Sequence, residues 1–423
     1  SGFGRTGTVD WQTGDIKTST FTAVNGQGFF ANTSGGAFTM NLPAGTAGNI
    51  VSVVDYTNTF NLNNLTITPN GSQKIGGANA NATLETQGQS VTFVYVDDTE
   101  GWKNVQDSTS NAVGRTFITA TGGNTVATCG NCKIHTFTSP GTFCVSVAST
   151  VAEENIVSYL IVAGGGGGGK HQAGGGGAGG YRELKSPLTP YTASPLCGYA
   201  ISANRATISA TAFPITVGSG GASGTSNCSG TGTSGGVSTF STITSAGGGG
   251  GGGYSNVPNG IAGANGGSGG GGSSSSQPGG ALSNGGTGNT PPTTPAQGNN
   301  GGGGFTPSPH SGGGGGGAAQ VGGSITGPGC NGGAGGAGQP TVITGSNVFR
   351  AGGGGGSAGS GPAGGPGGNG GGGKGGQGCN AAGTPNGANA GTDNTGGGGG
   401  GGASSAVQGA NGGSGIVVIR YKF

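Results

Sequence analysis

Residues 164–170 have the spacing of a phosphate-binding loop. Glycines at 164 and 169 are separated by four residues and followed by Lys170, directly after an apolar run. Such a loop also needs a Ser or Thr that coordinates magnesium and a helix behind it. Here His171 follows the lysine, and residues 172–180 are nearly all Gly and Ala. The match is expected by chance in a chain this rich in glycine, so we expect no nucleotide or other cofactor.

Two further groups of residues could hold a metal ion. Cys129 and Cys132 form a C-x-x-C motif, but a zinc site normally has four ligands and no second such pair exists. A local disulfide, a pair of loop thiols and a metal shared between subunits remain as alternatives. Asp97, Asp98 and Glu100 carry oxygens that calcium could use, yet their position before a glycine favours a solvated hairpin turn. We therefore expect no metal site.

Groups that could perform catalysis are scarce. The only histidines are His135, which lies in a strand-like pattern, and His171 and His310, which lie in glycine-flanked or loop segments. A hydrolytic triad needs a histidine beside a nucleophile and an oriented acid. Cleavage of polysaccharide needs paired carboxylates, and beyond residue 160 the chain offers only Glu183 and Asp393. The sequence therefore predicts no catalytic residues and no enzyme, with a depolymerase as the alternative.

The composition divides the chain into two parts. Glycine contributes 114 of the 423 residues, and only 20 of these glycines precede residue 161; average usage is about 7%. Charged residues amount to 6% and the formal net charge is +2, which argues against electrostatic binding of nucleic acid. No apolar run reaches the roughly 20 residues that span a bilayer. Because the chain begins at Ser1, we expect a processed product or a piece of a longer protein.

The cysteines are widely scattered and odd in number, so at least one stays free or pairs outside the chain. Their position in predicted loops suits an exported or virion-borne protein with some disulfides. The seven are Cys129, Cys132, Cys144, Cys197, Cys228, Cys330 and Cys379.

The sequence predicts an all-β chain that begins with a sandwich-like or barrel-like module over residues 1–107. Apolar-rich runs of four to eight residues alternate there with turns rich in Asn, Gly, Asp and Pro. Val91, Phe93 and Tyr95 are expected to share one face of a strand, with Val94 and Val96 on the other. The candidate strands are 20–24, 29–32, 37–42, 49–56, 65–68 and 90–96.

A linker is expected over residues 108–132, followed by a glycine-rich domain over residues 133–423. Strands within 133–162 and the closing segment 413–423 form the base of this domain. The apolar stretch 416–421 is expected to pair with a strand at 156–162 or at 144–147, so that the glycine-rich segment is looped out and clamped by strands at its base.

Between these base strands the chain alternates short β-like runs with polyglycine. Runs at 164–169, 247–253 and 352–356 each follow a strand-like segment that ends in Ala. An extended threefold helix rises about 3.1 Å per residue and points its backbone groups outward in three directions. Helices without side chains can approach closely enough to bond to one another. We therefore predict a packed bundle of polyglycine II helices, with flexible linkers as the alternative.

The connecting loops emerge at the ends of such a bundle and carry most of the sequence variety. Loops on a rigid scaffold are where binding usually resides. The residues predicted to contact a receptor are Tyr181, Tyr191, Tyr199, Tyr254, Phe305 and His310.

Several stretches resemble proteins of phage particles. One set resembles the glycine-rich domain of marine phage virion proteins, and a second set looks like the β-domain of tail-fibre-type proteins of cyanophages. In its design the glycine-rich part is also similar to the tip adhesins of T-even-like phages, which stack polyglycine II helices and bind host receptors with end loops. The first set is 133–138, 140–143, 159–169 and 413–421; the second is 4–11, 40–43 and 89–97.

The resemblance implies a virion fibre protein, located on the particle surface and present as a homotrimer. Its β-module would attach and trimerise, and its loops would bind a host cell-surface glycan or protein. Other fibre or baseplate proteins would be partners, with no nucleic acid and no membrane insertion. The alternative is a purely structural capsid or neck fibre, or an extracellular filament subunit, without receptor binding.

Overall fold

The chain divides into two compact units, Ser1–Gly114 and Arg115–Phe423. The structure is a computed structural model that describes residues 9–108, 116–226, 230–254, 260–275, 283–305, 310–325, 331–359, 363–378 and 386–423. Strands account for 29% and helical turns for 2% of the chain, with no α-helix among the described residues. The helical turns are the short 3-10 segments η1 (Ala152–Asn155) and η2 (Ser202–Asn204). The prediction of an all-β chain is confirmed.

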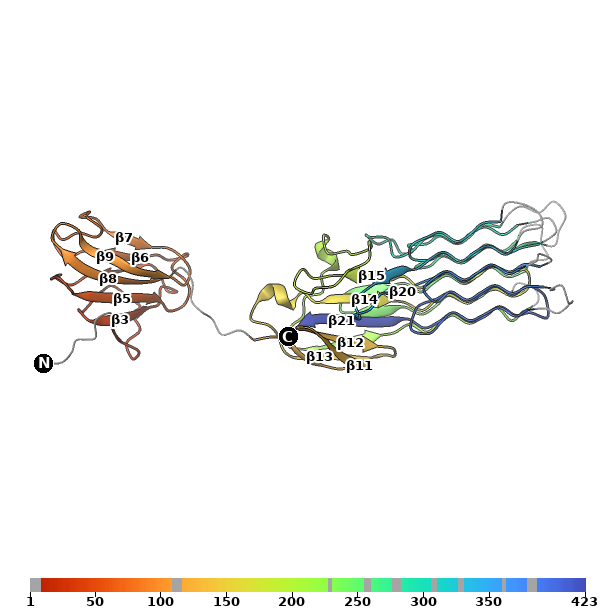
Figure 1. Ribbon diagram of the computed structural model, residues 1–423, viewed down its shortest axis with the longest axis horizontal. Helices are drawn as coiled ribbons and strands as arrows, with labels where there is room; N and C mark the ends of the chain where they lie inside the picture. Colours follow the sequence, from red (N-terminus) through yellow and green to blue (C-terminus); the bar gives the residue numbers. More distant parts are fainter. Residues whose placement is uncertain are drawn as a thin grey trace. The chain divides into compact units, whose positions relative to one another are not determined.

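The first unit is a sandwich of two sheets around one apolar core (Figure 1). One sheet has the order β1 (Asp10–Trp11), β3 (Gln27–Ala31), β5 (Ile50–Asp55), β8 (Ser90–Asp97) and β9 (Gly101–Ser108). The other has the order β2 (Phe21–Thr22), β4 (Phe38–Asn41), β6 (Leu65–Thr68) and β7 (Ala82–Leu84). From β1 to β6 successive strands alternate between the sheets, so each pairs in parallel with the strand two before it.

Alternation along β8 decides which of its side chains enter the core. Val91, Phe93 and Tyr95 are each 3% exposed and lie in the core between the sheets. Val96 is 46% exposed. The predicted division of this strand into two faces is confirmed for these residues, because successive side chains of a strand point to opposite sides of the sheet.

The second unit has two five-stranded sheets at its base and one small hairpin. The first sheet has the order β11 (Thr125–Cys129), β12 (Cys132–Phe137), β21 (Ile416–Lys422), β14 (Ser158–Val162) and β15 (Tyr181–Leu184). The second has the order β10 (Thr119–Thr121), β13 (Gly141–Val147), β16 (Ala212–Thr216), β17 (Ser238–Phe240) and β18 (Ile243–Ser245). The hairpin pairs β19 (Gln339–Thr341) with β20 (Val348–Arg350).

The closing strand β21 lies between β12 and β14 and pairs antiparallel with both. The predicted pairing with the strand near 156–162 is therefore confirmed. The alternative pairing with 144–147 is wrong, because β13 pairs with β10 and β16 instead. The predicted linker over 108–132 is also wrong in part, since it contains β10 and β11. Most residues of these two outer strands are exposed, so they lack the apolar pattern that marks a buried strand.

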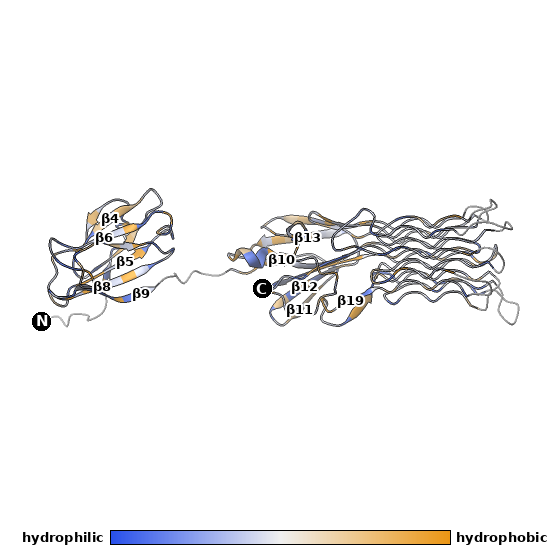
Figure 2. Ribbon diagram, turned by 90° about the horizontal axis from the view of Figure 1, so that it is seen from above, coloured by the Kyte–Doolittle hydropathy of each residue, from blue (hydrophilic) through white to orange (hydrophobic). Residues whose placement is uncertain are grey.

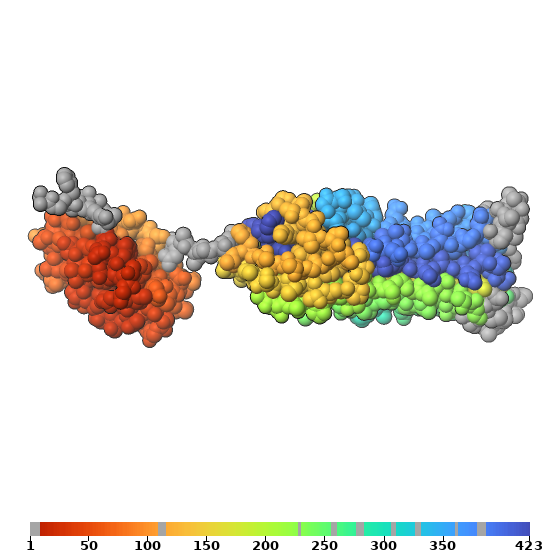
Figure 3. Space-filling model, turned by 90° about the horizontal axis from the view of Figure 1, so that it is seen from below, coloured from red at the N-terminus to blue at the C-terminus, as the bar shows by residue number. Residues whose placement is uncertain are grey.

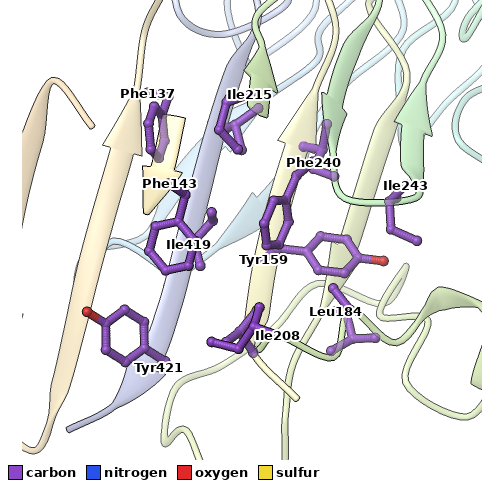
Figure 4. Close-up of a cluster of buried hydrophobic side chains, with 14 of the residues drawn as sticks. Phe137, Phe143, Tyr159, Leu184, Ile208, Ile215, Phe240, Ile243, Ile419 and Tyr421 are labelled. Atoms are coloured by element: carbon purple, nitrogen blue, oxygen red, sulfur yellow. The ribbon is translucent and has the colours of Figure 1, made fainter. Parts of the chain in front are cut away.

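Aromatic and aliphatic side chains fill the space between the two base sheets (Figure 4). The ring of Phe143 lies edge-on to Phe240, with centroids 6.1 Å apart, and also contacts Tyr421. On the opposite face of the first sheet a second core gathers Leu160, Val418 and other apolar residues. Strands β14 and β21 are thus buried on both faces, which explains their apolar runs 159–162 and 416–419.

A buried histidine ties β21 to its neighbours. His135 is fully buried; its Nδ1 lies 2.7 Å from the carbonyl oxygen of Gly122 and its Nε2 lies 3.0 Å from the Tyr421 hydroxyl. Burial lowers the pKa of His135, and it raises the pKa of Tyr421 to about 12. Both side chains are therefore neutral near pH 7, and each ring nitrogen of His135 has a partner.

The glycine-rich segment forms a bundle of extended runs that bond to one another through their backbones. The run 164–169 lies inside it, and amides three residues apart donate to the same neighbour. Gly164 donates to the Gly236 oxygen (3.0 Å) and Gly167 to the Thr233 oxygen (2.9 Å). Amides and carbonyls together reach six neighbours, as predicted for polyglycine II helices. These neighbours are 174–177, 221–224, 233–236, 248–251, 399–402 and 410–413.

Packing in this bundle leaves no room for most side chains. A Cβ at Gly167 would lie 2.0 Å from the carbonyl oxygen of Ala222, and one at Gly168 would lie 2.0 Å from that of Gly400. The strands of the base carry apolar side chains, whereas the bundle is mostly pale in hydropathy colours (Figure 2). Segments far apart in the sequence, drawn in green and blue, lie side by side along it (Figure 3). The core of this part is backbone.

Candidate functional site

The chain turns back at the tip of the bundle, which is the end away from the base strands (Figure 1). The run 164–169 leaves β14 and the run 174–180 leads into β15, so residues 170–172 form the turn between them. His171 and Gln172 have φ angles of 63° and 49°, which residues with a Cβ rarely adopt. The Lys170 ammonium donates to the Thr225 carbonyl oxygen at 3.1 Å, which links a neighbouring segment to this turn.

An aromatic pair lies at this turn. The ring of Tyr254 stacks on the imidazole of His171, with centroids 4.1 Å apart and planes 18° apart. The Tyr254 amide also donates to the Lys170 carbonyl oxygen at 3.2 Å. Both rings are partly exposed. The tip therefore carries two stacked rings that are partly exposed and are held in place by the turn at the end of the bundle.

Gln172 connects this pair to a second histidine. The Gln172 side chain lies against Gly359, where an added Cβ would be 3.2 Å from its Cγ. The Gly359 amide donates to the His310 carbonyl oxygen at 2.8 Å, and the Ser274 amide donates to the Gln172 carbonyl oxygen at 3.1 Å. Burial lowers the pKa of His310. Its imidazole is thus neutral at pH 7 and offers one donor and one acceptor.

A groove of about 630 Å³ runs along the flank of the bundle near Phe305. Phe305 follows the glycine run 301–304, which leads away from the base strands. It forms a β-bridge with Ser311, whose carbonyl oxygen accepts a hydrogen bond from the Phe305 amide at 3.0 Å. The carbonyl oxygens of Gly301 and Gly304 accept no hydrogen bond from the described residues. The groove thus combines one aromatic ring with polar backbone. Its lining is completed by Ser283, Asn284, Gly285, Asn300, Gly303, Ser324 and Ile325.

The three other predicted contact residues lie at the base. Tyr181 belongs to β15, is 1% exposed and donates its hydroxyl to the Glu183 carboxylate at 2.8 Å. Tyr191 is half-buried and donates to the Leu184 carbonyl oxygen at 3.3 Å, and Tyr199 packs against the base core. The prediction of Tyr181 as a loop contact is wrong, because the returning run enters a strand there and the sheet buries the ring.

The two acids beyond residue 160 occupy different surroundings. Glu183 is 2% exposed, and its carboxylate accepts from Tyr181, from the Ser194 amide (3.0 Å) and from the Thr341 hydroxyl (2.6 Å). Asp393 is exposed and accepts from the Ser414 amide at 3.0 Å. These hydrogen bonds give both carboxylates structural partners within the domain.

The cysteines that the structure describes are free thiols. Cys129 and Cys132 face each other at the end of the β11–β12 hairpin, so the alternative of a local disulfide is wrong for this pair. Cys228, Cys330 and Cys379 lie outside the described residues. Within the described ranges no group of three or more His, Cys, Asp or Glu side chains could hold a metal ion. Nor does that part of the chain contain a helix of the length and apolarity that crossing a membrane requires.

The structure places Tyr254, Phe305 and His310 at ends of glycine runs that lie away from the base strands, and it separates them from the tyrosines of the base. The sequence analysis considered the segment 170–172 as a failed phosphate-binding loop and His171 as a residue without catalytic partners, but not as the tip of a bundle. Its signal as a tip turn was present, because Lys170, His171 and Gln172 are the only residues other than Gly and Ala between 163 and 180. In a bundle that admits few side chains, such an interruption marks a chain reversal.

These features define a class of protein: an all-β chain whose second unit is a backbone-packed glycine bundle with a turn-bearing tip. A family model described as a glycine-rich domain matches residues 136–422. The chain therefore belongs to this glycine-rich domain family. No curated protein matches the chain.

Proposed function

We propose that this chain is a phage virion fibre protein that binds a host cell surface through the tip of its glycine bundle. The observation that carries the proposal is the partly exposed His171–Tyr254 stack on a rigid scaffold. Rigid support lowers the entropy lost on binding, because the contact residues are already ordered. Aromatic residues also supply much of the binding energy at protein interfaces.

The proposal includes a location and partners. The chain would lie on the surface of the particle, assemble as a homotrimer through the first unit and contact other fibre or baseplate proteins. The host ligand would be a cell-surface glycan or protein. The resemblance of the sequence to phage virion proteins supports this part of the proposal.

Adsorption of virus particles to host cells tests the tip directly. Particles carrying His171→Ala together with Tyr254→Ala should adsorb at least about tenfold more slowly, as expected for loss of a central aromatic contact. Val321→Ala is the matched control, because Val321 is 63% exposed in the same unit and lies outside the tip. Equal adsorption of the tip variant and the control would refute receptor binding by this aromatic pair.

The second candidate function is a purely structural fibre or filament subunit without a receptor. The bundle itself favours this candidate, because a core made of hydrogen-bonded backbone is stable without a ligand. Labelling of the chain on intact particles separates the two functions. A position at the tail tip supports adhesion, whereas a position along the capsid or neck supports the structural role.

A further inference from the structure

The outer face of the five-stranded sheet in the first unit carries a row of aromatic side chains. Trp11 on β1 is 41% exposed, and Tyr56 directly after β5 is 51% exposed. Phe30 on β3 lies between them, with ring centroids 5.3 Å from Trp11 and 6.2 Å from Tyr56. Its neighbours Phe29 and Ala31 point to the opposite side, into the core. Three rings on adjacent strands thus form a continuous surface that the core does not use.

The position of Trp11 depends on a glycine beneath it. Gly28 pairs with Trp11 across β1 and β3, and a Cβ on Gly28 would lie 2.6 Å from Cε3 of the indole. The ring can lie against the sheet only because this residue has no side chain. On the same face of β5, next to Gly28 and Phe30, the residues Ser52 and Val54 are uncharged. The aromatic surface is therefore preorganised and lies beside neutral side chains.

Hydrogen-bonding groups border the row at Tyr56. The Tyr56 amide donates to the Ala31 carbonyl oxygen at 2.9 Å. Tyr56 therefore lies beside Asn32, the residue that follows Ala31. The Asn32 side-chain oxygen accepts from the Thr57 hydroxyl at 3.0 Å and from the Ser34 amide at 3.0 Å. Its Nδ2 group has no partner within the described ranges. An oriented amide donor therefore lies beside the exposed rings.

The size of the surface points to a small ligand. An aromatic side chain buries about 150–250 Å², so at these exposures Trp11 and Tyr56 together offer about 140–230 Å², and the half-buried Phe30 adds less than either. A stable protein–protein interface buries about 800 Å² on each partner. The aromatic row is too small to hold a second copy or another protein by itself, and it lacks the charges that an anionic ligand would need.

We propose that the row formed by Trp11, Phe30 and Tyr56 binds a neutral oligosaccharide. Sugar rings carry C–H groups on flat faces that stack on aromatic rings and hydroxyls on their edges that accept or donate hydrogen bonds. Successive sugar rings lie along successive aromatic rings of the row, and the Asn32 amide donates to a sugar hydroxyl. This site is on the first unit and does not depend on receptor binding by the tip of the second.

Tryptophan fluorescence of the full chain provides the test. The chain has two tryptophans, and Trp102 is fully buried, so a ligand on the row should change the emission of Trp11 alone. Cellohexaose and chitohexaose are the neutral probes, and a galacturonic acid hexamer is the charged comparison. Either neutral probe should shift the emission in a saturable way, and the charged hexamer should bind at least about tenfold more weakly.

Variants identify the surface. Tyr56→Ala should weaken binding by about fivefold or more, as for loss of one stacked ring. Leu62→Ala, at a residue that is 75% exposed, should stay within about twofold of the unmodified chain. Gly28→Ala should weaken binding by displacing Trp11, whereas Gly14→Ala should not, since nothing lies within 4 Å of an added Cβ at Gly14.

Three results would overturn the proposal. One is the absence of any saturable change with both neutral probes. Another is equal affinity of Tyr56→Ala and Leu62→Ala. The third is an oligomeric unmodified chain that becomes monomeric in the Tyr56→Ala or Trp11→Ala variant, as measured by light scattering, while the sugars have no effect on the unmodified chain. That result would assign the row to self-association. Emission of the buried Trp102 reports in each variant whether the first unit is still folded.

Discussion

Replacement of a single glycine inside the bundle should destabilise the second unit strongly. Gly167 donates to the Thr233 oxygen at 2.9 Å and accepts from the Gly251 amide at 2.9 Å. A Cβ at this residue would lie 2.0 Å from the Ala222 carbonyl oxygen and 2.4 Å from its carbonyl carbon. The clash is with backbone, so no side-chain rotation can relieve it. Gly167→Ala therefore forces two helices apart and stretches hydrogen bonds to their neighbours.

The magnitude follows from opposing contributions. Overpacking costs about 1–3 kcal/mol, and weakening two backbone hydrogen bonds adds about 1 kcal/mol each. Loss of glycine flexibility in the unfolded chain returns about 0.4–1 kcal/mol. We expect a net loss of about 2–5 kcal/mol in the free energy of unfolding. Amide hydrogen exchange of 164–169 should accelerate correspondingly, because local opening becomes easier.

Gly387→Ala is the matched control, since nothing lies within 4 Å of an added Cβ there. Its melting temperature should equal that of the unmodified chain or exceed it slightly. Thermal unfolding and hydrogen exchange of the two variants give the comparison. If the Gly167→Ala and Gly387→Ala variants had the same melting temperature and the same amide protection, the backbone-packed bundle would be refuted.

Three further predictions concern the base of the second unit. Acidification from pH 7 to 5 should lower the free energy of unfolding, because burial holds the pKa of His135 below its ordinary 6.5; this stability is present above the unfolded pKa and is lost as pH falls through the folded one. In His135→Phe the pH slope should diminish by up to about 1.4 kcal/mol per pH unit, and an unchanged slope would contradict the assignment. Ile419→Ala leaves a cavity at a fully buried position and should lower the free energy of unfolding in urea by about 2–5 kcal/mol. Val126→Ala, at a residue that is 53% exposed, should change this free energy by less than about 0.5 kcal/mol, and similar effects of the two substitutions would disprove burial of the closing strand. Glu183→Gln should destabilise the unit by about 1–3 kcal/mol, because buried donors lose a charged acceptor, and unchanged thermal unfolding would show that this network contributes nothing.

Periodicity in the sequence was sufficient to locate the main buried strands. Val91, Phe93 and Tyr95 alternate as a half-buried strand does, and the apolar stretch 416–421 could satisfy its burial only within a sheet. Strands β10 and β11 were not predicted, because their mostly exposed residues carry no such pattern. The parallel pairing in the sandwich was not predicted either, because the local sequence pattern does not indicate in which of the two sheets a strand lies.

The candidate site was predictable only in part. Tyr254 and Phe305 follow glycine runs directly, so their position at the end of the bundle could be expected. Tyr181 also follows a glycine run, yet that run points toward the base and the ring is buried. Direction along the bundle depends on how many times the chain has already reversed, and no local feature of the sequence reports it.

The sequence by itself determined that the second unit is built from backbone. Runs of glycine lack the side chains that an apolar core needs, so their only route to a folded state is mutual hydrogen bonding. The tertiary structure decided which runs are neighbours and which turns share an end. Those choices depend on backbone hydrogen bonds between segments far apart in the chain, such as the one from the Gly167 amide to the Thr233 carbonyl oxygen. Because the backbone groups of all glycine runs are chemically equivalent, the sequence of a run does not specify which other runs it pairs with.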